Sequence, residues 1–211
     1  YGPRGGGKRT VAAALAETLH GKLYRADARD VLGECGAKLK AVLDDARLSD
    51  SILLLDGFEH AFAANAAAAG DGLVELAAPL SKALDALGAH PGVVLLVAHV
   101  EDLSTLRFAP SFARRLALAL PFATPDAKLR ARLWRAVLPP ACPLAADVDF
   151  ARLGAKHELL PASIRRAALL AAAAAAKRGA AEIGHADLHG AAEPRHLALR
   201  GDGANFDRLF V

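Results

Sequence analysis

The chain has no methionine, only two cysteines, and aromatic residues make up 5% of its 211 positions. Cys35 and Cys142 stand far apart and outside any CxxC pair, which excludes a disulfide framework and favours a reducing, cytoplasmic compartment. The absence of methionine predicts a fragment or a processed chain. No apolar run reaches the ~20 residues that a membrane-spanning helix needs, and no signal peptide is visible, so we expect no membrane partner.

A strong charge of one sign is also absent. The net charge is +3, with both signs mixed along the chain, so we expect no nucleic-acid partner. Hydrophobic residues make up 54% and charged residues 23%, which excludes intrinsic disorder. Alanine is the commonest residue, and this bias predicts a helix-rich protein packed through small side chains.

Strand-like and helix-like segments alternate in the first 124 residues. Short apolar runs predict strands at residues 23–26, 52–55, 93–98 and 116–120, and helical spacing of apolar residues predicts helices at 8–19, 36–47 and 73–87. This alternation predicts an α/β fold with a parallel sheet flanked by helices. Because a loop such as residues 2–7 normally follows a buried strand, we expect the first strand to be missing or truncated.

After Pro125 the strand-like runs disappear. Apolar periodicity predicts four helices, at residues 126–137, 150–155, 162–178 and 185–192. We therefore expect an α/β subdomain over residues 1–124, a helical subdomain over 125–192, and a tail of unknown role over 193–211.

The clearest motif is a glycine-rich loop of the form GxxxxGK that precedes the first predicted helix. It consists of Gly2, Pro3, Arg4, Gly5, Gly6, Gly7 and Lys8. The glycines let backbone N–H groups turn towards a phosphate, the helix adds its dipole, and Lys8 reaches the outer phosphates. A flexible linker is the alternative, but the helix that follows favours phosphate binding. The Ser or Thr that should follow the lysine and hold Mg²⁺ is Arg9, and Thr10 lies one position later, about 100° around the helix.

The second motif is the apolar run 52–55, which ends in Asp56. Open α/β sheets bind ligands at the carboxyl ends of their strands, so Asp56 is a candidate to hold Mg²⁺ through water.

Together these residues resemble the AAA+ ATPases, the hexameric ring motors, along nearly the whole chain. The segments that carry the resemblance are residues 2–16, 32–47, 92–103, 110–115, 121–126, 134–140 and 162–167. The closest similarity is to the bacterial subgroup often encoded with extracellular contractile injection systems. The resemblance implies a P-loop NTPase sheet followed by a helical lid, with ATP or ADP and Mg²⁺ as cofactors. It also implies self-association into a hexameric ring that remodels a protein partner.

The resemblance also assigns roles to single residues. His99 takes the place of the polar sensor, Arg114 and Arg115 match the fingers that reach a neighbour's γ-phosphate, and Arg165 matches the second sensor of the lid. The departures lie at the chemistry. Gly57 replaces the glutamate that polarises water, so that Glu59, two positions later, is the nearest substitute. Val31 or Leu32 stands where the pore-loop aromatic belongs.

Each assignment has a plainer alternative. His99 can be a core histidine bonded to backbone, Arg114 and Arg115 can be a solvated helix end, and Glu59 with His60 can pass for a metal cluster. Two function classes remain open, namely an active AAA+ ATPase and a nucleotide-binding pseudo-ATPase. We expect nucleotide binding with weak or absent turnover, and we expect Arg9→Thr combined with Gly57→Glu to raise hydrolysis.

Overall fold

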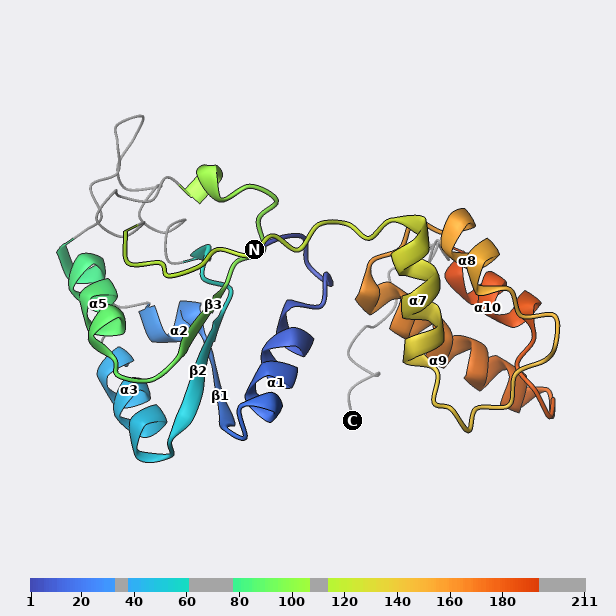
Figure 1. Cartoon of the computed structure of the whole chain (residues 1–211), viewed down its shortest axis with the longest axis horizontal. Helices are drawn as coiled ribbons and strands as arrows, with labels where there is room; N and C mark the ends of the chain where they lie inside the picture. The colour runs from blue at the N-terminus through green and yellow to red at the C-terminus, as the bar shows by residue number, and fades with distance from the viewer. Residues whose placement is uncertain (33–37, 61–77, 107–113, 194–211) are drawn as a thin grey trace, which may run out of the picture. The chain divides into compact units, whose positions relative to one another are not determined.

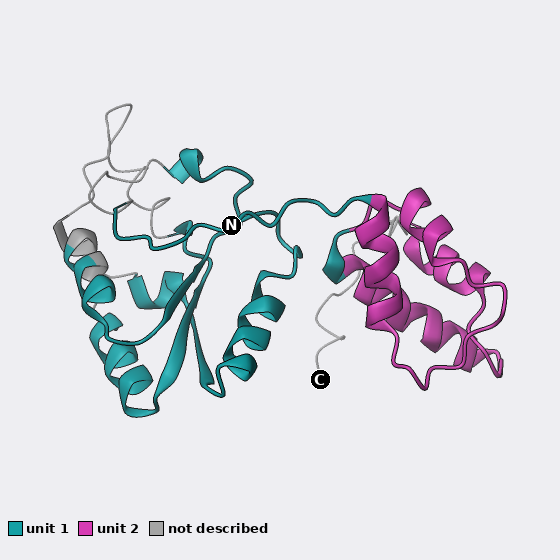
Figure 2. Ribbon diagram, in the orientation of Figure 1, with its two compact units in different colours: residues 1–126, 160–162 teal, residues 127–159, 163–211 magenta. Residues whose placement is uncertain are grey.

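The computed structural model describes residues 1–32, 38–60, 78–106 and 114–193 (Figure 1). The chain divides into two compact units (Figure 2). Unit 1 comprises residues 1–126 and 160–162, and unit 2 comprises residues 127–159 and 163–211.

Unit 1 is built on a parallel sheet with strand order β1-β2-β3. The strands are β1 (Lys22–Asp27), β2 (Ser51–Asp56) and β3 (Val94–Val97). Asp56 lies opposite Asp27 on one side and opposite Val97 on the other, so the three carboxyl ends meet at one edge. Leu53, Leu54 and Leu55 of the central strand have no exposed surface, which explains why its sequence is a continuous apolar run. The predicted parallel α/β sheet is confirmed.

Helices cover both faces of this sheet. They are α1 (Lys8–Thr18), α2 (Ala28–Leu32), α3 (Leu39–Leu48) and α5 (Ala78–Ala89), with a 3₁₀ turn at Leu103–Leu106. Figure 1 shows α1 on one face and α3 and α5 on the other. Ala12 of α1 packs on Leu54, whereas Leu53 and Leu55 pack in the cluster on the opposite face. Alternate side chains of β2 thus anchor opposite layers.

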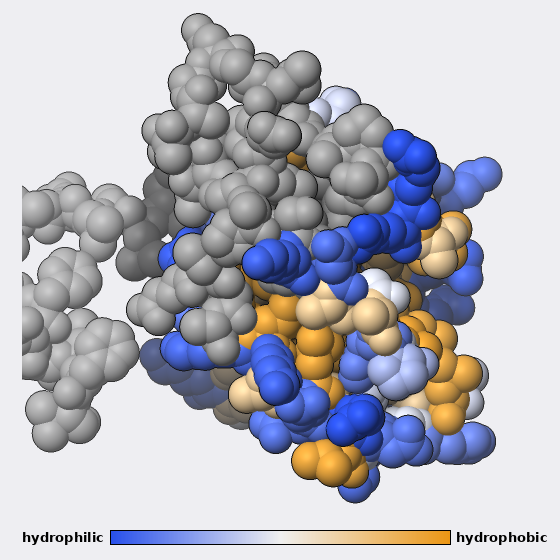
Figure 3. Space-filling model, turned by 90° about the vertical axis from the view of Figure 1, so that its left-hand side faces the viewer, coloured by the Kyte–Doolittle hydropathy of each residue, from blue (hydrophilic) through white to orange (hydrophobic). Residues whose placement is uncertain are grey.

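On the face drawn in Figure 3, hydrophobic residues form small areas bordered by hydrophilic ones.

The strand predicted at residues 116–120 is wrong. These residues lie in the described part of the chain and form no strand, and Leu118 and Leu120 are 72% and 54% exposed. The backbone bonds recorded for the end of this segment go to Tyr1, whose amino group donates to Leu120 O (2.9 Å) and whose carbonyl accepts from Phe122 N–H (2.7 Å). A single residue cannot provide the repeated ladder that defines a strand.

Two helix predictions need smaller corrections. The helix predicted at 8–19 ends at Thr18, and its buried apolar residues are Ala12 and Ala16, whereas Leu15 and Leu19 are 38% and 55% exposed. The helix predicted at 36–47 begins at Leu39, and residues 36–37 lie outside the described part of the chain, as do residues 73–77 of the helix predicted at 73–87.

Unit 2 is helical. Its helices are α7 (Ala127–Val137), α8 (Phe150–Lys156), α9 (Pro161–Lys177) and α10 (His185–Ala192), each within about two residues of its predicted range. Trp134, Leu153, Ile164 and Leu188 fill the core together with alanines of α9, so small residues do provide the packing. The Asp149 carboxylate caps α8 by accepting from Arg152 N–H at 3.0 Å. Within the described residues, no helix is long and apolar enough to cross a membrane.

Candidate functional site

The glycine-rich loop closes on itself in front of α1. Gly6 N–H donates to Pro3 O at 3.2 Å. Gly5 and Gly7 have φ angles of 86° and 92°, which residues other than glycine rarely adopt. Gly7 is the N-cap residue of α1, and no side-chain hydrogen bond from the described residues caps the helix there. The first-turn N–H groups and the helix dipole therefore favour an anion at this end.

Lys8 is held inside the loop. Lys8 is only 6% exposed, and its Nζ donates to Gly2 O at 2.6 Å and to Pro3 O at 2.8 Å. Burial lowers the pKa of Lys8, while the charges of Glu59 and Asp56 act in the opposite direction. An anionic ligand would stabilise this buried ammonium, because its negative charge would offset the loss of hydration.

Asp56 ends β2 between two basic groups. Its Oδ2 lies 3.3 Å from Nη1 of Arg9, and its Oδ1 lies 3.1 Å from Nε2 of His99 at the end of β3. The predicted candidates from the loop, the central strand and the neighbouring strand thus meet at the carboxyl edge of the sheet, where a parallel sheet binds its ligand.

Glu59 reaches the same edge although it lies two positions after the usual place. Its Oε2 accepts from the backbone N–H of His99 at 3.0 Å, and its Oε1 lies 3.5 Å from Nη2 of Arg4. The chain turns sharply after Asp56 because Gly57 has a φ of 75°. This turn brings Glu59 back towards β3, so that one carboxylate binds both the loop and the neighbouring strand.

His99 is part of the site. Its ring binds the Asp56 carboxylate, and its Nδ1 is buried with no hydrogen-bond partner among the residues that the structure describes. Burial is the main cause that lowers the pKa of His99. The alternative, a core histidine whose ring bonds to backbone, is wrong, because the His99 ring binds the Asp56 carboxylate.

His60 and Arg29 join the edge of the site. Nε2 of His60 lies 3.4 Å from Nη2 of Arg4 and 3.2 Å from Nη2 of Arg29. In the described ranges, no group of three or more His, Cys, Asp or Glu side chains is arranged to hold a metal ion. Sequence analysis missed Arg29, and its only signal is its place two residues after the end of β1.

The structure also gives the positions of the other predicted residues. Arg115 pairs with Asp85 of α5, Arg114 and Thr10 are exposed, and Arg165 is an exposed residue of α9. Residues 110–113 of the predicted finger segment lie outside the described part of the chain. Val31 and Leu32, at the position of the pore-loop aromatic, are core residues of α2.

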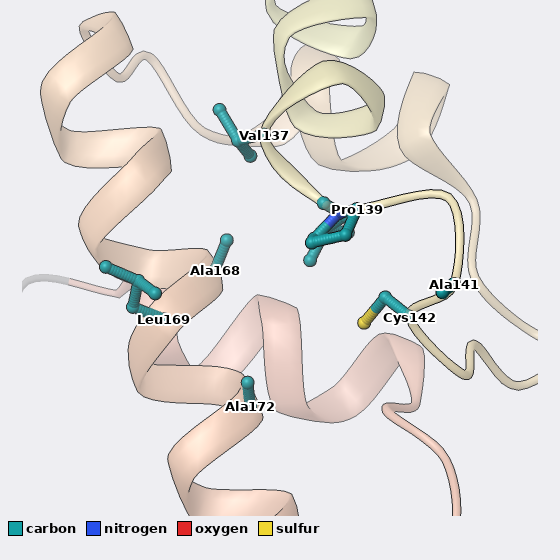
Figure 4. Close-up of a pocket in the computed structure, with 8 residues that line it drawn as sticks. Val137, Pro139, Ala141, Cys142, Ala168, Leu169 and Ala172 are labelled. Carbon is teal, nitrogen blue, oxygen red and sulfur yellow. The ribbon is translucent and has the colours of Figure 1, made fainter.

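A cavity of about 390 Å³ lies in unit 2, but its chemistry is different. Figure 4 shows it between the end of α7, the segment that follows and α9, where Val137, Pro139, Cys142, Ala168 and Leu169 line it. Its lining is mostly apolar and includes no charged side chain, so it does not suit a phosphate.

The residues at the sheet edge fit the phosphates of a nucleotide. They offer backbone N–H groups, a helix N-terminus and the ammonium of Lys8. They do not fit Mg²⁺ in the same way, because position 9 supplies a guanidinium in place of a hydroxyl and both Asp56 oxygens face basic groups.

A parallel α/β sheet with a glycine-rich loop and a buried lysine at its carboxyl edge defines a P-loop nucleotide-binding protein. The family model for the ATPase family associated with various cellular activities (AAA) matches residues 1–118, and the chain belongs to this family. No curated protein matches the chain. The match covers the loop, Asp56, His99 and both candidate finger arginines, while Arg165 lies beyond it. The resemblance to AAA+ ATPases is thereby confirmed, and the chain is a nucleotide-binding AAA+ module.

Proposed function

We propose that this chain binds ATP and ADP at its glycine-rich loop, and that ATP binding with slow hydrolysis drives conformational changes of a hexameric ring that remodels a protein partner in the cytoplasm. One observation carries the proposal. Lys8 of the loop and the carboxylates Asp56 and Glu59 gather at one edge of the sheet, linked by Arg9 and Arg4. This arrangement supports the proposal, because phosphate-binding and acidic groups share the edge at which parallel sheets bind ligands.

Glu59 is the group that would orient the attacking water. Its carboxylate is only 13% exposed, and the backbone of His99 and the side chain of Arg4 fix it at the sheet edge. A carboxylate held in this way can accept a proton from water without losing its orientation. His99, which contacts Asp56 and Glu59 together, would link the state of the phosphate to β3.

Ring formation would bring arginines from one subunit to the nucleotide of the next. The Arg115 guanidinium is already paired with Asp85 within its own subunit, so it must leave that carboxylate to act in trans. Arg114 is the second candidate for this role. Arg165 would contact phosphate as the second sensor, and the subgroup associated with contractile injection systems is the setting we propose for the ring. Each of these roles comes from the family resemblance.

A pseudo-ATPase is the second candidate function. The ion pair between Arg9 and Asp56 favours this function, because position 9 would need a hydroxyl to help hold the metal. Gly57 also favours it, because this glycine stands in a left-handed turn in place of the usual glutamate. In that case the chain would bind nucleotide and stabilise a ring while another domain hydrolyses ATP.

ATP turnover by Glu59→Gln separates these functions. If the chain is an ATPase, this variant loses about 10²–10⁴-fold in turnover, as general-base variants do, while it keeps its affinity for ATP. Glu17→Gln, on the exposed side of α1, is the matched control and should turn over ATP like the unmodified protein. ATP binding without turnover in the unmodified protein would favour the pseudo-ATPase. Equal turnover in Glu59→Gln and the unmodified protein would exclude Glu59 as the base.

A further inference from the structure

The position after Lys8 carries a cation where a magnesium-dependent loop carries a hydroxyl. This residue is Arg9, and the next hydroxyl, on Thr10, is exposed and lies about 100° further around α1. Mg²⁺ requires a nearly octahedral set of oxygen ligands and tolerates little distortion. The start of α1 therefore lacks the oxygen that would complete such a set.

The Arg9 guanidinium lies against the carboxylate that would otherwise serve the metal. Its Nη1 is 3.3 Å from Oδ2 of Asp56, while Oδ1 faces His99 at 3.1 Å. The Asp56 side chain is 14% exposed and the Arg9 side chain is 56% exposed. The ion pair is thus shielded at its carboxylate end and open to solvent at its guanidinium end, so an arriving anion would meet Arg9 before Asp56.

The chemistry of guanidinium suits this place. It keeps its proton at every physiological pH, and its planar set of five N–H donors can bind a carboxylate on one side and phosphate oxygens on the other. Lys8 and Arg4 add two positive charges to the same loop, against the two negative charges of Asp56 and Glu59. Together with Arg9, three cationic side chains face two carboxylates, so one positive charge is left over to offset part of a phosphate's charge.

We propose that Arg9 takes the place of Mg²⁺, bridging Asp56 and the outer phosphates, so that the site binds metal-free nucleoside di- and triphosphates. This inference rests on the proposed nucleotide binding and deepens it. It replaces the water-mediated contact with Mg²⁺ that the resemblance implies for Asp56.

The test is calorimetric titration of the purified protein with a non-hydrolysable ATP analogue, in excess Mg²⁺ and in excess EDTA. The unmodified protein should bind the analogue in EDTA at least as tightly as in Mg²⁺. Arg9→Thr, which restores the hydroxyl, should bind the analogue at least about tenfold more tightly in Mg²⁺ than in EDTA. Arg9→Lys keeps the charge without the planar fork, so it should bind more weakly but remain independent of the metal.

Three results would overturn the inference and leave the proposed function intact. In the first, the unmodified protein binds the analogue at least about tenfold more tightly in Mg²⁺ than in EDTA. In the second, a folded Arg9→Thr variant binds the analogue with the same metal independence as the unmodified protein. In the third, Arg9→Lys loses metal independence, and this variant provides the test if Arg9→Thr does not fold. Absence of binding by the unmodified protein in both buffers would overturn the proposed function and this inference together.

Discussion

Gly57 lies in a left-handed turn, so substituting it should destabilise the protein by an amount that can be measured. This cost also applies to Gly57→Glu, which would restore the acidic pair. With a φ of 75°, any residue other than glycine at this position should cost about 1–2 kcal/mol of folding free energy. A Cβ atom there would also lie 3.2 Å from Cδ2 of His60, which requires a small shift of that ring. We therefore expect Gly57→Ala to lower Tm by roughly 2–8 °C, at about 2–4 °C for each kcal/mol.

The assay is thermal unfolding of Gly57→Ala and Gly57→Asn, each with and without His60→Ala. Asn should cost less than Ala, because its side chain tolerates the left-handed region. His60→Ala should recover part of the loss in Gly57→Ala, because it removes the crowded ring. An unchanged Tm in Gly57→Ala would refute the reasoning. The expectation that Gly57→Glu with Arg9→Thr raises hydrolysis must be revised accordingly, since the same φ applies to glutamate and the variant should lose stability.

Two further predictions concern unit 2. Burial lowers the pKa of His157 below its ordinary value of 6.5, so the unfolded state binds the proton more readily than the folded state does. The free energy of unfolding of this unit should therefore be highest above about pH 6.5 and should fall as the pH decreases. The His157 ring is held by the bond between its Nε2 and Nδ1 of His189, which are 2.7 Å apart. Tm measured against pH should fall less steeply in His157→Leu, and equal slopes would contradict the assignment. Gly154→Ala should destabilise the unit by about 1–3 kcal/mol, because its Cβ would lie 2.5 Å from Ala127 O. Gly190→Ala on α10, where a Cβ would meet nothing within 4 Å, should instead stabilise it by about 0.5–1 kcal/mol, and denaturant unfolding of both variants tests the pair.

The fold was predictable wherever a segment has one strong pattern. The apolar run of β2 is buried on both faces, and the alanine-rich helix α9 and its neighbours follow regular helical spacing. The strand predicted at residues 116–120 failed because an apolar run shows only that a segment can form a strand. Whether it does depends on a partner with free backbone groups, and that partner is not encoded in the run itself.

The sequence indicated most of the candidate-site residues, although not Arg29, but it did not indicate the contacts between them. The motif spacing indicated Lys8 and Asp56 as site residues, and the family resemblance added His99, whose ring lies 3.1 Å from the Asp56 carboxylate. It could not show that Arg9 faces Asp56, because that contact depends on the direction of a long side chain at the start of α1. Nor could it show how Glu59 returns to the site, since the return depends on the φ of Gly57.

The central claim, that the loop holds nucleotide phosphates through Lys8, is tested most directly by calorimetric titration of ATP into the unmodified protein and Lys8→Ala. Each hydrogen bond from the ammonium to a phosphate contributes about 1.5–3 kcal/mol, so the variant should lose at least about tenfold in affinity. Lys40→Ala, an exposed position on α3, is the control and should bind like the unmodified protein. Unchanged ATP affinity in a folded Lys8→Ala protein would contradict the account.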